Sequence, residues 1–278
     1  MEGRGDPRAR PRTLESVFNK GGRPGDEVGR IDRQRPSSRH WRGNRTMFID
    51  LHVHTRHYSG CSNIEARGLI ERVSQVGLDG VVLTEHGILW KREKMAPLVE
   101  LAEERGLLLL AGQEVTCFYR GRRQGDFLVF GLDYSLGSNM AAQEMIERVH
   151  AEGGVVVAAH PYKPSRLGVS YYGAGDQVYE LQLDALELYH PEHDEAARRK
   201  VKLAAGKLGI PMTGGSDAHE LYHVGVCCTR FKRGVATLED LVEALRKGEI
   251  EPVNGVPGRA LRHRDPERPA DRTKRPPR

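Results

Sequence analysis

The chain has 278 residues and a formal net charge of +5, and 38% of its residues are hydrophobic. This length allows one large domain or two small ones, and no apolar run reaches the roughly 18 residues of a helical membrane span. No apolar segment follows a basic start, which argues against a secretory signal. The four cysteines lack metal-binding or disulfide spacing, so we expect a cytoplasmic protein with reduced thiols.

The positive charge of the chain lies at its two ends. Residues 1–46 carry 12 basic and 6 acidic residues, residues 257–278 carry 8 and 3, and residues 47–256 carry 23 and 29. Both ends lack apolar periodicity, so we expect disordered basic tails around a mildly acidic domain at 47–256. Such tails can contact RNA or DNA weakly through phosphates. Alternatively, translation begins at Met47 and the first 46 residues are an upstream extension.

Strand-like and helix-like segments alternate between the two tails. Repeated β-α units favour a parallel sheet in a barrel or a doubly wound α/β fold. Thr237 is expected to cap the last helix. In chain order, the spacing of apolar residues predicts a strand at 48–53, a helix at 64–76, a strand at 80–84, a helix at 97–105, strands at 107–111 and 127–130, a helix at 140–151, strands at 155–159 and 183–189, a helix at 195–207, a strand at 210–213 and a helix at 237–246.

Side chains that bind metals follow the predicted strands at their carboxyl ends. His52 and His54 stand two residues apart at a strand end, so both can point to one face. Asp217 and His219 form a second such pair after Gly214-Gly215, which we expect to turn the chain sharply. One pair alone is a weak signal. Seven metal-ligating residues lie at the rim where α/β barrels build active sites: His52, His54, His86, Glu114, His160, Asp217 and His219.

Five motifs in order resemble the PHP (polymerase and histidinol phosphatase) domain family. They are DLHVHT at 50–55, LTEHG at 83–87, GQEV at 112–115, AAHP at 158–161 and GGSDAH at 214–219. The resemblance spans residues 47–230 and implies a distorted seven-stranded β/α barrel that binds up to three metal ions and hydrolyses phosphate esters. The segment LELYHPEH at 186–193 is similar to that of members that act on nucleotides or RNA ends.

The resemblance also implies which residues bind the metal ions. It implies a first ion held by His52, His54, Glu114 and Asp217. A second would use His86 and His219, and a third would use Glu114 together with His160. Imidazole and carboxylate ligands suit Zn, Mn or Fe, so we expect two or three divalent ions.

The sequence departs from the family pattern at two ligand positions. Gly60 stands near the place of an Asp or His ligand of the second ion, and His57 or Cys61 could replace it, although His57 also fits an exposed loop. Asp126 stands where a histidine ligand of the third ion is common, and we expect its carboxylate to bind metal. Glu85 replaces a usual Asp, a change from which we expect little effect.

The expected chemistry follows from these metal ions. Closely spaced divalent cations lower the pKa of a bridging water, and the resulting hydroxide attacks phosphorus, so no side-chain nucleophile is needed. The sequence accordingly shows no Gly-x-Ser-x-Gly elbow and no P-loop. Lys163 and Arg166 are candidates to bind the substrate phosphate, and His190 and His193 are candidates to donate a proton to the leaving group. Solvated loop cations and a helix-capping role are the alternatives.

Three functions remain open at this point. The first is a metal-dependent phosphoesterase that acts on a small phosphorylated substrate, either a phosphomonoester or a nucleotide or RNA end. The second is an amidohydrolase, because an HxH motif at a first strand also opens that group of enzymes. The third is a binding module whose metal centre has partly decayed at Gly60 and Asp126. The charge run of Arg120, Arg122 and Arg123 is expected to be solvated.

Overall fold

The structure, a computed structural model, describes residues 43, 45–165, 168 and 170–256. The expected C-terminal tail lies outside these residues, and so does the expected N-terminal tail except for residues 43, 45 and 46. Arg166 also lies outside them. None of the described helices is both long and apolar enough to cross a membrane.

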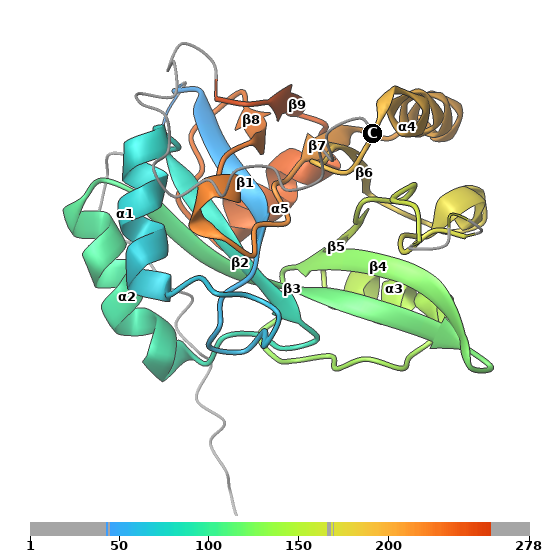
Figure 1. Cartoon of the computed structure of the whole chain (residues 1–278), viewed down its shortest axis with the longest axis horizontal. Coiled ribbons are helices and arrows are strands. Elements are labelled where there is room, and N and C mark those ends of the chain that lie inside the picture. Colours follow the sequence, from blue (N-terminus) through green and yellow to red (C-terminus); the bar gives the residue numbers. More distant parts are fainter. Residues whose placement is uncertain (1–42, 44, 166–167, 169, 257–278) are drawn as a thin grey trace, which may run out of the picture. The chain divides into compact units, whose positions relative to one another are not determined.

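One mixed sheet of nine strands organises the described residues (Figure 1). The strands lie in the order β7-β6-β5-β4-β3-β2-β1-β8-β9. Neighbours are parallel from β1 to β3 and from β5 to β7, whereas β4 is antiparallel to β3 and β5, and β8 is antiparallel to β1 and β9. The strands are β1 (Met47–Val53), β2 (Gly80–His86), β3 (Leu108–Tyr119), β4 (Arg122–Phe130), β5 (Val155–Ala158), β6 (Ala185–Tyr189), β7 (Met212–Gly214), β8 (Cys227–Phe231) and β9 (Ile250–Asn254).

The edge strand β7 returns to the other end of the sheet. The Gly214 N–H donates to Thr229 Oγ1 of β8 (2.9 Å), and that hydroxyl donates back to the Gly214 carbonyl (2.8 Å). Just after β7, Ala218 forms a parallel bridge with Val53, and the His54 N–H donates to the Ala218 carbonyl (3.1 Å). The first seven strands therefore form the nearly closed, distorted barrel that the sequence predicts. The antiparallel pair of β8 and β9 follows at this edge, with β8 beside the amino-terminal half of β1.

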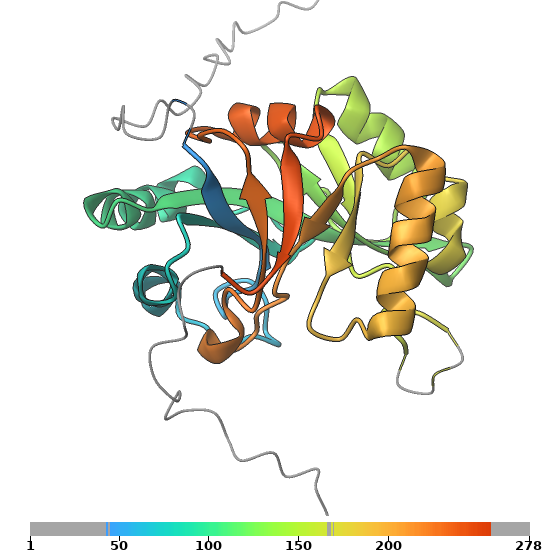
Figure 2. The ribbon, with the colours of Figure 1, turned by 90° about the horizontal axis from the view of Figure 1, so that it is seen from above.

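Five α-helices accompany the described strands, and Figure 2 shows α5, which connects β8 to β9, beside these two strands. Two helix starts are fixed by side chains that accept backbone N–H groups, as expected of N-caps. The Asp194 carboxylate accepts from the Ala197 N–H at the start of α4, and Thr237 forms a reciprocal capping box with Asp240 at the start of α5. The predicted Thr237 cap is thus confirmed. The helices are α1 (Ala66–Val76), α2 (Arg92–Glu104), α3 (Ala142–Ala151), α4 (Glu195–Leu208) and α5 (Leu238–Arg246), and the short 3₁₀ turns are η2 (Gly175–Tyr179) and η3 (Leu221–His223).

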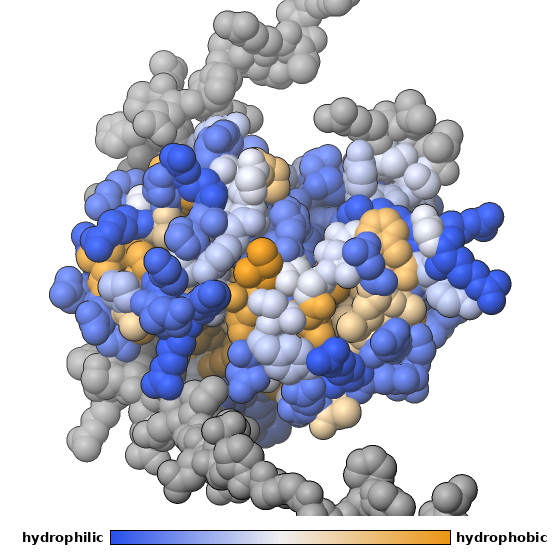
Figure 3. All heavy atoms as spheres, turned by 90° about the horizontal axis from the view of Figure 1, so that it is seen from below, coloured by the Kyte–Doolittle hydropathy of each residue, from blue (hydrophilic) through white to orange (hydrophobic). Residues whose placement is uncertain are grey.

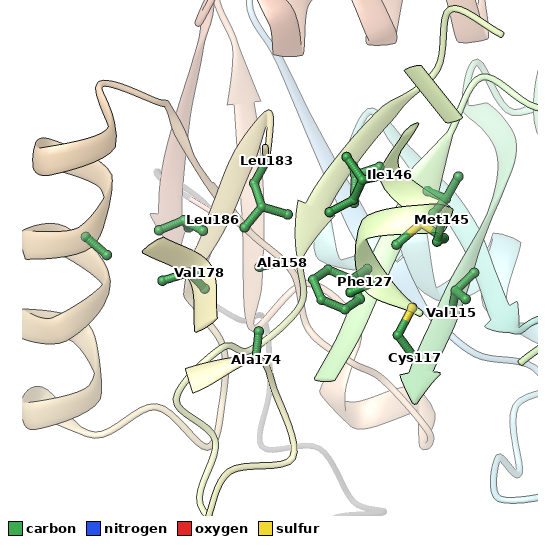
Figure 4. Packing of buried hydrophobic residues seen from close by; sticks show 14 of the residues in the cluster. Val115, Cys117, Phe127, Met145, Ile146, Ala158, Ala174, Val178, Leu183 and Leu186 are labelled. Carbon is green, nitrogen blue, oxygen red and sulfur yellow. The ribbon is translucent and has the colours of Figure 1, made fainter. Parts of the chain in front are cut away.

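Buried apolar side chains form three clusters around the sheet. One cluster joins strand residues such as Leu51 and Leu128 to Leu241 and Leu245 of α5. A second packs α1 and α2 against the first three strands. In the third, Met145 and Ile146 of α3 point toward Phe127 of β4 (Figure 4). Burial of each large apolar side chain stabilises the fold by roughly 1.5–3 kcal/mol.

The surface contrasts with these clusters. On the face shown in Figure 3, hydrophilic residues predominate, and hydrophobic residues form separate small patches. Among the described residues, Tyr119, Tyr179 and Leu203 are the large hydrophobic residues that remain exposed. Scattered apolar residues of this kind are usual on a folded domain and do not mark an interface.

The structure corrects several predicted elements. Helix α2 begins at Arg92, five residues before the predicted start, with Pro97 inside it. Proline is usual at the first helical position, which is why the sequence predicts a start at position 97. Strands β3 and β4 extend into a long antiparallel hairpin, where the sequence predicts only residues 107–111 and 127–130. Strands β8 and β9 are not among the predicted elements, because they are short and carry charged residues and Pro252.

Candidate metal centre

The barrel brings the predicted metal-binding side chains to one end of its strands. His52 belongs to β1 and Glu114 to β3, while His160 and Asp217 closely follow β5 and β7. His160 and Asp217 have positive φ angles of 28° and 48°. Such angles are unfavourable for residues other than glycine and concentrate at functional sites. Two of the strand ends therefore hold strained backbone where the side chains converge.

Gly214 and Gly215 serve a purpose other than the expected sharp turn. Gly214 lies within β7. A Cβ at Gly215 would lie 2.6 Å from the Cβ of His52, a distance that real Cβ atoms essentially never show. A glycine is required because the backbone before Asp217 passes directly over the His52 side chain.

The Glu114 carboxylate lies at the centre of four histidines. Its Oε1 atom is 3.4 Å from His52 Nε2 and 3.1 Å from His160 Nε2. Its Oε2 atom is 3.4 Å from His54 Nε2 and 2.9 Å from His86 Nδ1. The Glu114 side chain is only 3% exposed. One carboxylate thus faces every imidazole that the sequence placed on β1, on β2 and after β5.

Asp217 faces the same two histidines of β1 from the opposite strand. Its Oδ1 atom is 3.5 Å from His52 Nε2 and 3.2 Å from His54 Nε2. Its Oδ2 atom is 3.1 Å from His190 Nε2 and 3.0 Å from Lys163 Nζ. His52 and His54 therefore lie between two buried carboxylates, as the two sequence pairs predicted.

The unpartnered ring nitrogens of this cluster show that it suits a divalent metal ion. His52 Nε2 and both ring nitrogens of His54 are buried and have no hydrogen-bond partner among the described residues. Buried polar atoms are nearly always satisfied, so such atoms require an explanation. Four groups of donors lie within 4.8 Å of one another: His52, His54 and Asp217; His52, Glu114 and His160; His54, His86 and His219; and His160, His190 and Asp217.

The charges of the cluster reinforce one another. Burial disfavours the charged form of His52, but the carboxylates of Glu187, Asp217 and Glu114 outweigh it and raise the pKa of His52 well above its usual value. Burial likewise opposes ionisation of Glu114, yet His52 and His160 hold the pKa of Glu114 well below its ordinary range. The pKa of Asp217 is lowered in the same way. The site thus keeps its carboxylates negative, as a cation site requires.

Glu187 orients two of the histidines from behind, a role that the sequence analysis missed. Its Oε1 atom accepts from His52 Nδ1 (3.2 Å), and its Oε2 atom accepts from the His160 backbone N–H (2.8 Å). A proton held on Nδ1 leaves the Nε2 lone pair of His52 facing the cluster, which is the tautomer that a metal ligand needs. The one signal in the sequence was a glutamate within the apolar run of β6, and the structure shows that this glutamate is fully buried.

Two further buried carboxylates support the loops around the site. Glu85 accepts hydrogen bonds from the Thr55 backbone, the Ser59 hydroxyl and Trp90 Nε1, which holds the loop after β1 in place. Asp50 accepts from the Ser216 and Gly225 N–H groups (3.0 and 3.1 Å), and burial raises its pKa to about 6. Both carboxylates are fully buried, and Asp50 also accepts from the His52 backbone N–H (3.3 Å).

Lys163 and His190, two of the predicted substrate-binding residues, lie beside Asp217. His190 Nδ1 accepts from the Glu192 N–H (3.1 Å), which places the ring proton on Nε2, directed at Asp217. Burial lowers the pKa of His190 to about 4, so the ring is neutral near pH 7. Lys163 Nζ bridges Asp217 Oδ2 (3.0 Å) and Glu192 (2.8 Å). A neutral N–H donor and an ammonium group therefore line one side of the cluster.

His86 and His219 occupy the more exposed side of the cluster. Their side chains are 41% and 29% exposed, and His219 Nδ1 lies 2.9 Å from the Asp217 carbonyl. Cys61 Sγ lies 3.3 Å from His86 Nε2. His57 instead stacks on Trp90, with 4.7 Å between the ring centroids. Of the two candidates to replace the ligand near Gly60, the structure brings Cys61 to the histidines.

Asp126 lies at the edge of the cluster and is held by its own neighbours. Its Oδ2 atom is 3.9 Å from His160 Nε2 and forms an ion pair with Arg123 Nη2. Its Oδ1 atom accepts from Thr116 Oγ1 (2.7 Å). Burial and the charge of Glu114 raise the pKa of Asp126. Arg123, expected as a solvated cation, is thus a partner of the site.

A family model described as PHP-associated matches residues 195–250. This stretch runs from α4 to the first residue of β9, so it contains Asp217, His219 and strand β8, which pairs with β1. The match adds to a nearly closed barrel whose strand ends carry the five motifs in order. The chain therefore resembles the PHP domain family in its fold, its motifs and this PHP-associated region.

Three known proteins resemble this chain. The uncharacterized protein MJ1587 of Methanocaldococcus jannaschii is 24% identical over 167 residues, which cover 56% of this chain and 90% of that protein. A candidate metal-dependent phosphoesterase from Bifidobacterium adolescentis has 20% identity and a TM-score of 0.52, with 72% of this chain and 96% of that one covered. PsfC from Pseudomonas syringae has 20% identity and a TM-score of 0.52, with 75% and 91% covered. The two structural likenesses concern the fold.

Proposed function

We propose that this chain is a metal-dependent hydrolase of phosphate esters, acting on a phosphomonoester or on the end of a small nucleotide or RNA. One observation carries the proposal: His52 Nε2 and His54 Nε2 are buried and unpartnered between the carboxylates of Glu114 and Asp217. The resemblance to metal-dependent phosphoesterases of the PHP family supports the reaction class. Glu114 fills the central bridging position in which amidohydrolases more often carry a modified lysine, so we favour phosphate esters.

The proposed metal sites follow the donor groups. We assign a first ion to His52, His54, Glu114 and Asp217, and a second to His86 and His219. Glu114 and His160 are the groups implied for a third ion. Zn, Mn and Fe suit such donors. Bound divalent ions would lower the pKa of a water molecule and offset the charge on the phosphoryl oxygens.

Other residues of the chain would position the substrate. Lys163 presents a fixed ammonium group beside Asp217, where it can bind a phosphoryl oxygen. His190 is neutral near pH 7, so it would serve as a hydrogen-bond donor through Nε2–H rather than as a source of protons. Arg166 remains a proposed partner of the phosphate. The specificity groups on the surrounding loops decide which ester is bound.

The proposal is tested by a hydrolysis screen of the whole chain loaded with Mn or Zn. The substrates are nucleoside monophosphates and bisphosphates, histidinol phosphate, short RNA and a model phosphodiester. We expect phosphate release from at least one monoester, with loss of this activity in His52→Ala and Asp217→Ala. Glu251→Gln alters only the exposed ion pairs with Arg230 and Lys232 and should keep full activity. A metal-loaded chain that hydrolyses none of these esters would favour a binding module instead.

We further propose that Cys61 is a ligand of the second ion, because its Sγ atom lies beside His86 Nε2. The thiolate is a soft ligand that suits Zn. With Co²⁺ in place of the native ion, a thiolate ligand should produce a sulfur-to-metal charge-transfer band in the near ultraviolet. We expect this band in the wild-type chain and in His57→Ala, and its loss in Cys61→Ser. A band that survives in Cys61→Ser would show that Cys61 is not a ligand.

A further inference from the structure

The ion pair of Arg123 and Asp126 occupies a corner of the metal centre that the proposed sites leave unexplained. Both oxygens of Asp126 are engaged, one by Thr116 Oγ1 (2.7 Å) and the other by Arg123 Nη2. The Asp126 side chain is 5% exposed. Arginine stays charged at any physiological pH. The negative charge of Asp126 is therefore already neutralised by a cation of the chain itself.

The geometry of this corner does not suit a third metal ion. Asp126 Oδ2 is 3.9 Å from His160 Nε2, which is 3.1 Å from Glu114 Oε1. Although these atoms lie near one another, Asp126 belongs to none of the four groups of possible metal ligands among the described residues. An ion bound here would need to lie about 2 Å from an oxygen that Arg123 already holds. It would also be repelled by the guanidinium in a buried setting, where charge interactions are strong.

Arg123 is fixed in this position by contacts on its other side. Its Nε atom donates to the Tyr172 carbonyl (3.0 Å), and its guanidinium lies over the Tyr172 ring, 5.6 Å from the centroid. Gly125 allows this approach, because a Cβ there would lie 2.5 Å from Ala174 N. The Arg123 side chain is 36% exposed, and its Nη1 group has no partner among the residues that the structure describes. A rigid cation with free N–H groups thus faces the rim of the site.

We propose that the Arg123 guanidinium takes the place of a divalent ion at the corner of Glu114, Asp126 and His160, and that its free N–H groups bind an oxyanion of the substrate or product. The proposal rests on the metal centre proposed above. A planar guanidinium can donate two parallel hydrogen bonds to a phosphate, with a geometry that a metal ion does not impose. Asp126 is then a positioning residue for Arg123 and not a metal ligand.

The first test counts metal ions in the whole chain after loading with Mn or Zn, by elemental analysis. Asp126→Asn should contain as many ions as the wild type, because Asp126 binds none. Arg123→Met should contain one more ion per chain, because Asp126, Glu114 and His160 are then free to bind it. The control is Arg122→Met, which removes the neighbouring exposed arginine and should change nothing. Loss of an ion in Asp126→Asn, or no gain in Arg123→Met, would overturn the proposal.

The second test measures the affinity for inorganic phosphate by calorimetry. The double variant Arg123→Met/Asp126→Asn removes both charges of the pair, so its metal content should match the wild type. We expect its affinity for phosphate to be about ten- to a hundredfold weaker, the loss typical of a charge-assisted hydrogen bond. Unchanged affinity at equal metal content would refute oxyanion binding by Arg123. Neither test requires turnover, so an inactive chain can still support the proposal and an active chain can overturn it.

Discussion

Glu114→Gln is expected to remove at least one metal ion per chain and to lower ester hydrolysis by more than about 100-fold. Mutation of a residue that only hydrogen-bonds to a metal ligand costs up to roughly 100-fold, and Glu114 is itself a proposed ligand. Glutamine keeps the shape of the side chain but not its charge. Glu114 is the only described carboxylate that faces His52, His54, His86 and His160 together. The glutamine amide would leave Asp217 as the carboxylate that faces both His52 Nε2 and His54 Nε2, so the proposed metal sites would be weakened together.

Metal content and activity should be measured on the same preparations of Glu114→Gln. In the metal-free variant, the pKa of His52 should fall, because Glu114 is one of three carboxylates that raise it. This fall can be followed by NMR titration of the imidazole, and it reports on the cluster without turnover. Glu251→Gln, which changes an exposed side chain of β9, is the matched control. Full metal content in Glu114→Gln would show that the ions do not depend on this carboxylate.

The barrel could be predicted because its strands are short apolar runs that end in polar residues. Val81, Val82 and Leu83 of β2, for example, are buried and lead directly to Glu85 and His86. Strands β8 and β9 could not be predicted in the same way. Thr229 of β8 is buried, and its hydroxyl bonds the backbone of Gly214 in β7. That contact spans the closing seam of the barrel, which no local pattern reveals.

The candidate site likewise contains residues that the sequence reveals and residues that it does not. Histidines and carboxylates at strand ends are recognisable from their type and spacing, as for His52 and His54. Arg123 is different, because its partner Asp126 lies on the same strand while Tyr172 comes from a distant loop. A charge run near a turn is usually solvated, so no local pattern connects Arg123 with the site. Only the fold of the β3–β4 hairpin reveals this contact.

Glu187→Gln is expected to weaken binding of the first metal ion by about 10- to 100-fold, although Glu187 does not face the cluster. The carboxylate accepts two hydrogen bonds, from His52 Nδ1 (3.2 Å) and from the His160 N–H (2.8 Å). A glutamine has only one accepting oxygen. If that oxygen is directed at His160, the amide group donates to His52 Nδ1 and moves the ring proton to Nε2, where the metal should bind. If the oxygen is directed at His52, the NH₂ group of the glutamine lies against the His160 N–H. The hydrogen bond that holds the strained backbone of His160 is then lost.

The two orientations of the glutamine in the Glu187→Gln variant can be separated by experiment. Competition with a chelator gives the metal affinity, and ¹⁵N NMR of the imidazoles in the metal-free variant, at a pH high enough for His52 to be neutral, shows which His52 nitrogen carries the proton. A shift of the proton to Nε2 with weaker metal binding indicates the first orientation. Weaker binding with an unchanged tautomer indicates displacement of His160. Unchanged affinity would show that Glu187 only stabilises the fold, in which case urea unfolding should still detect its loss, since an unsatisfied buried donor costs about 1–3 kcal/mol.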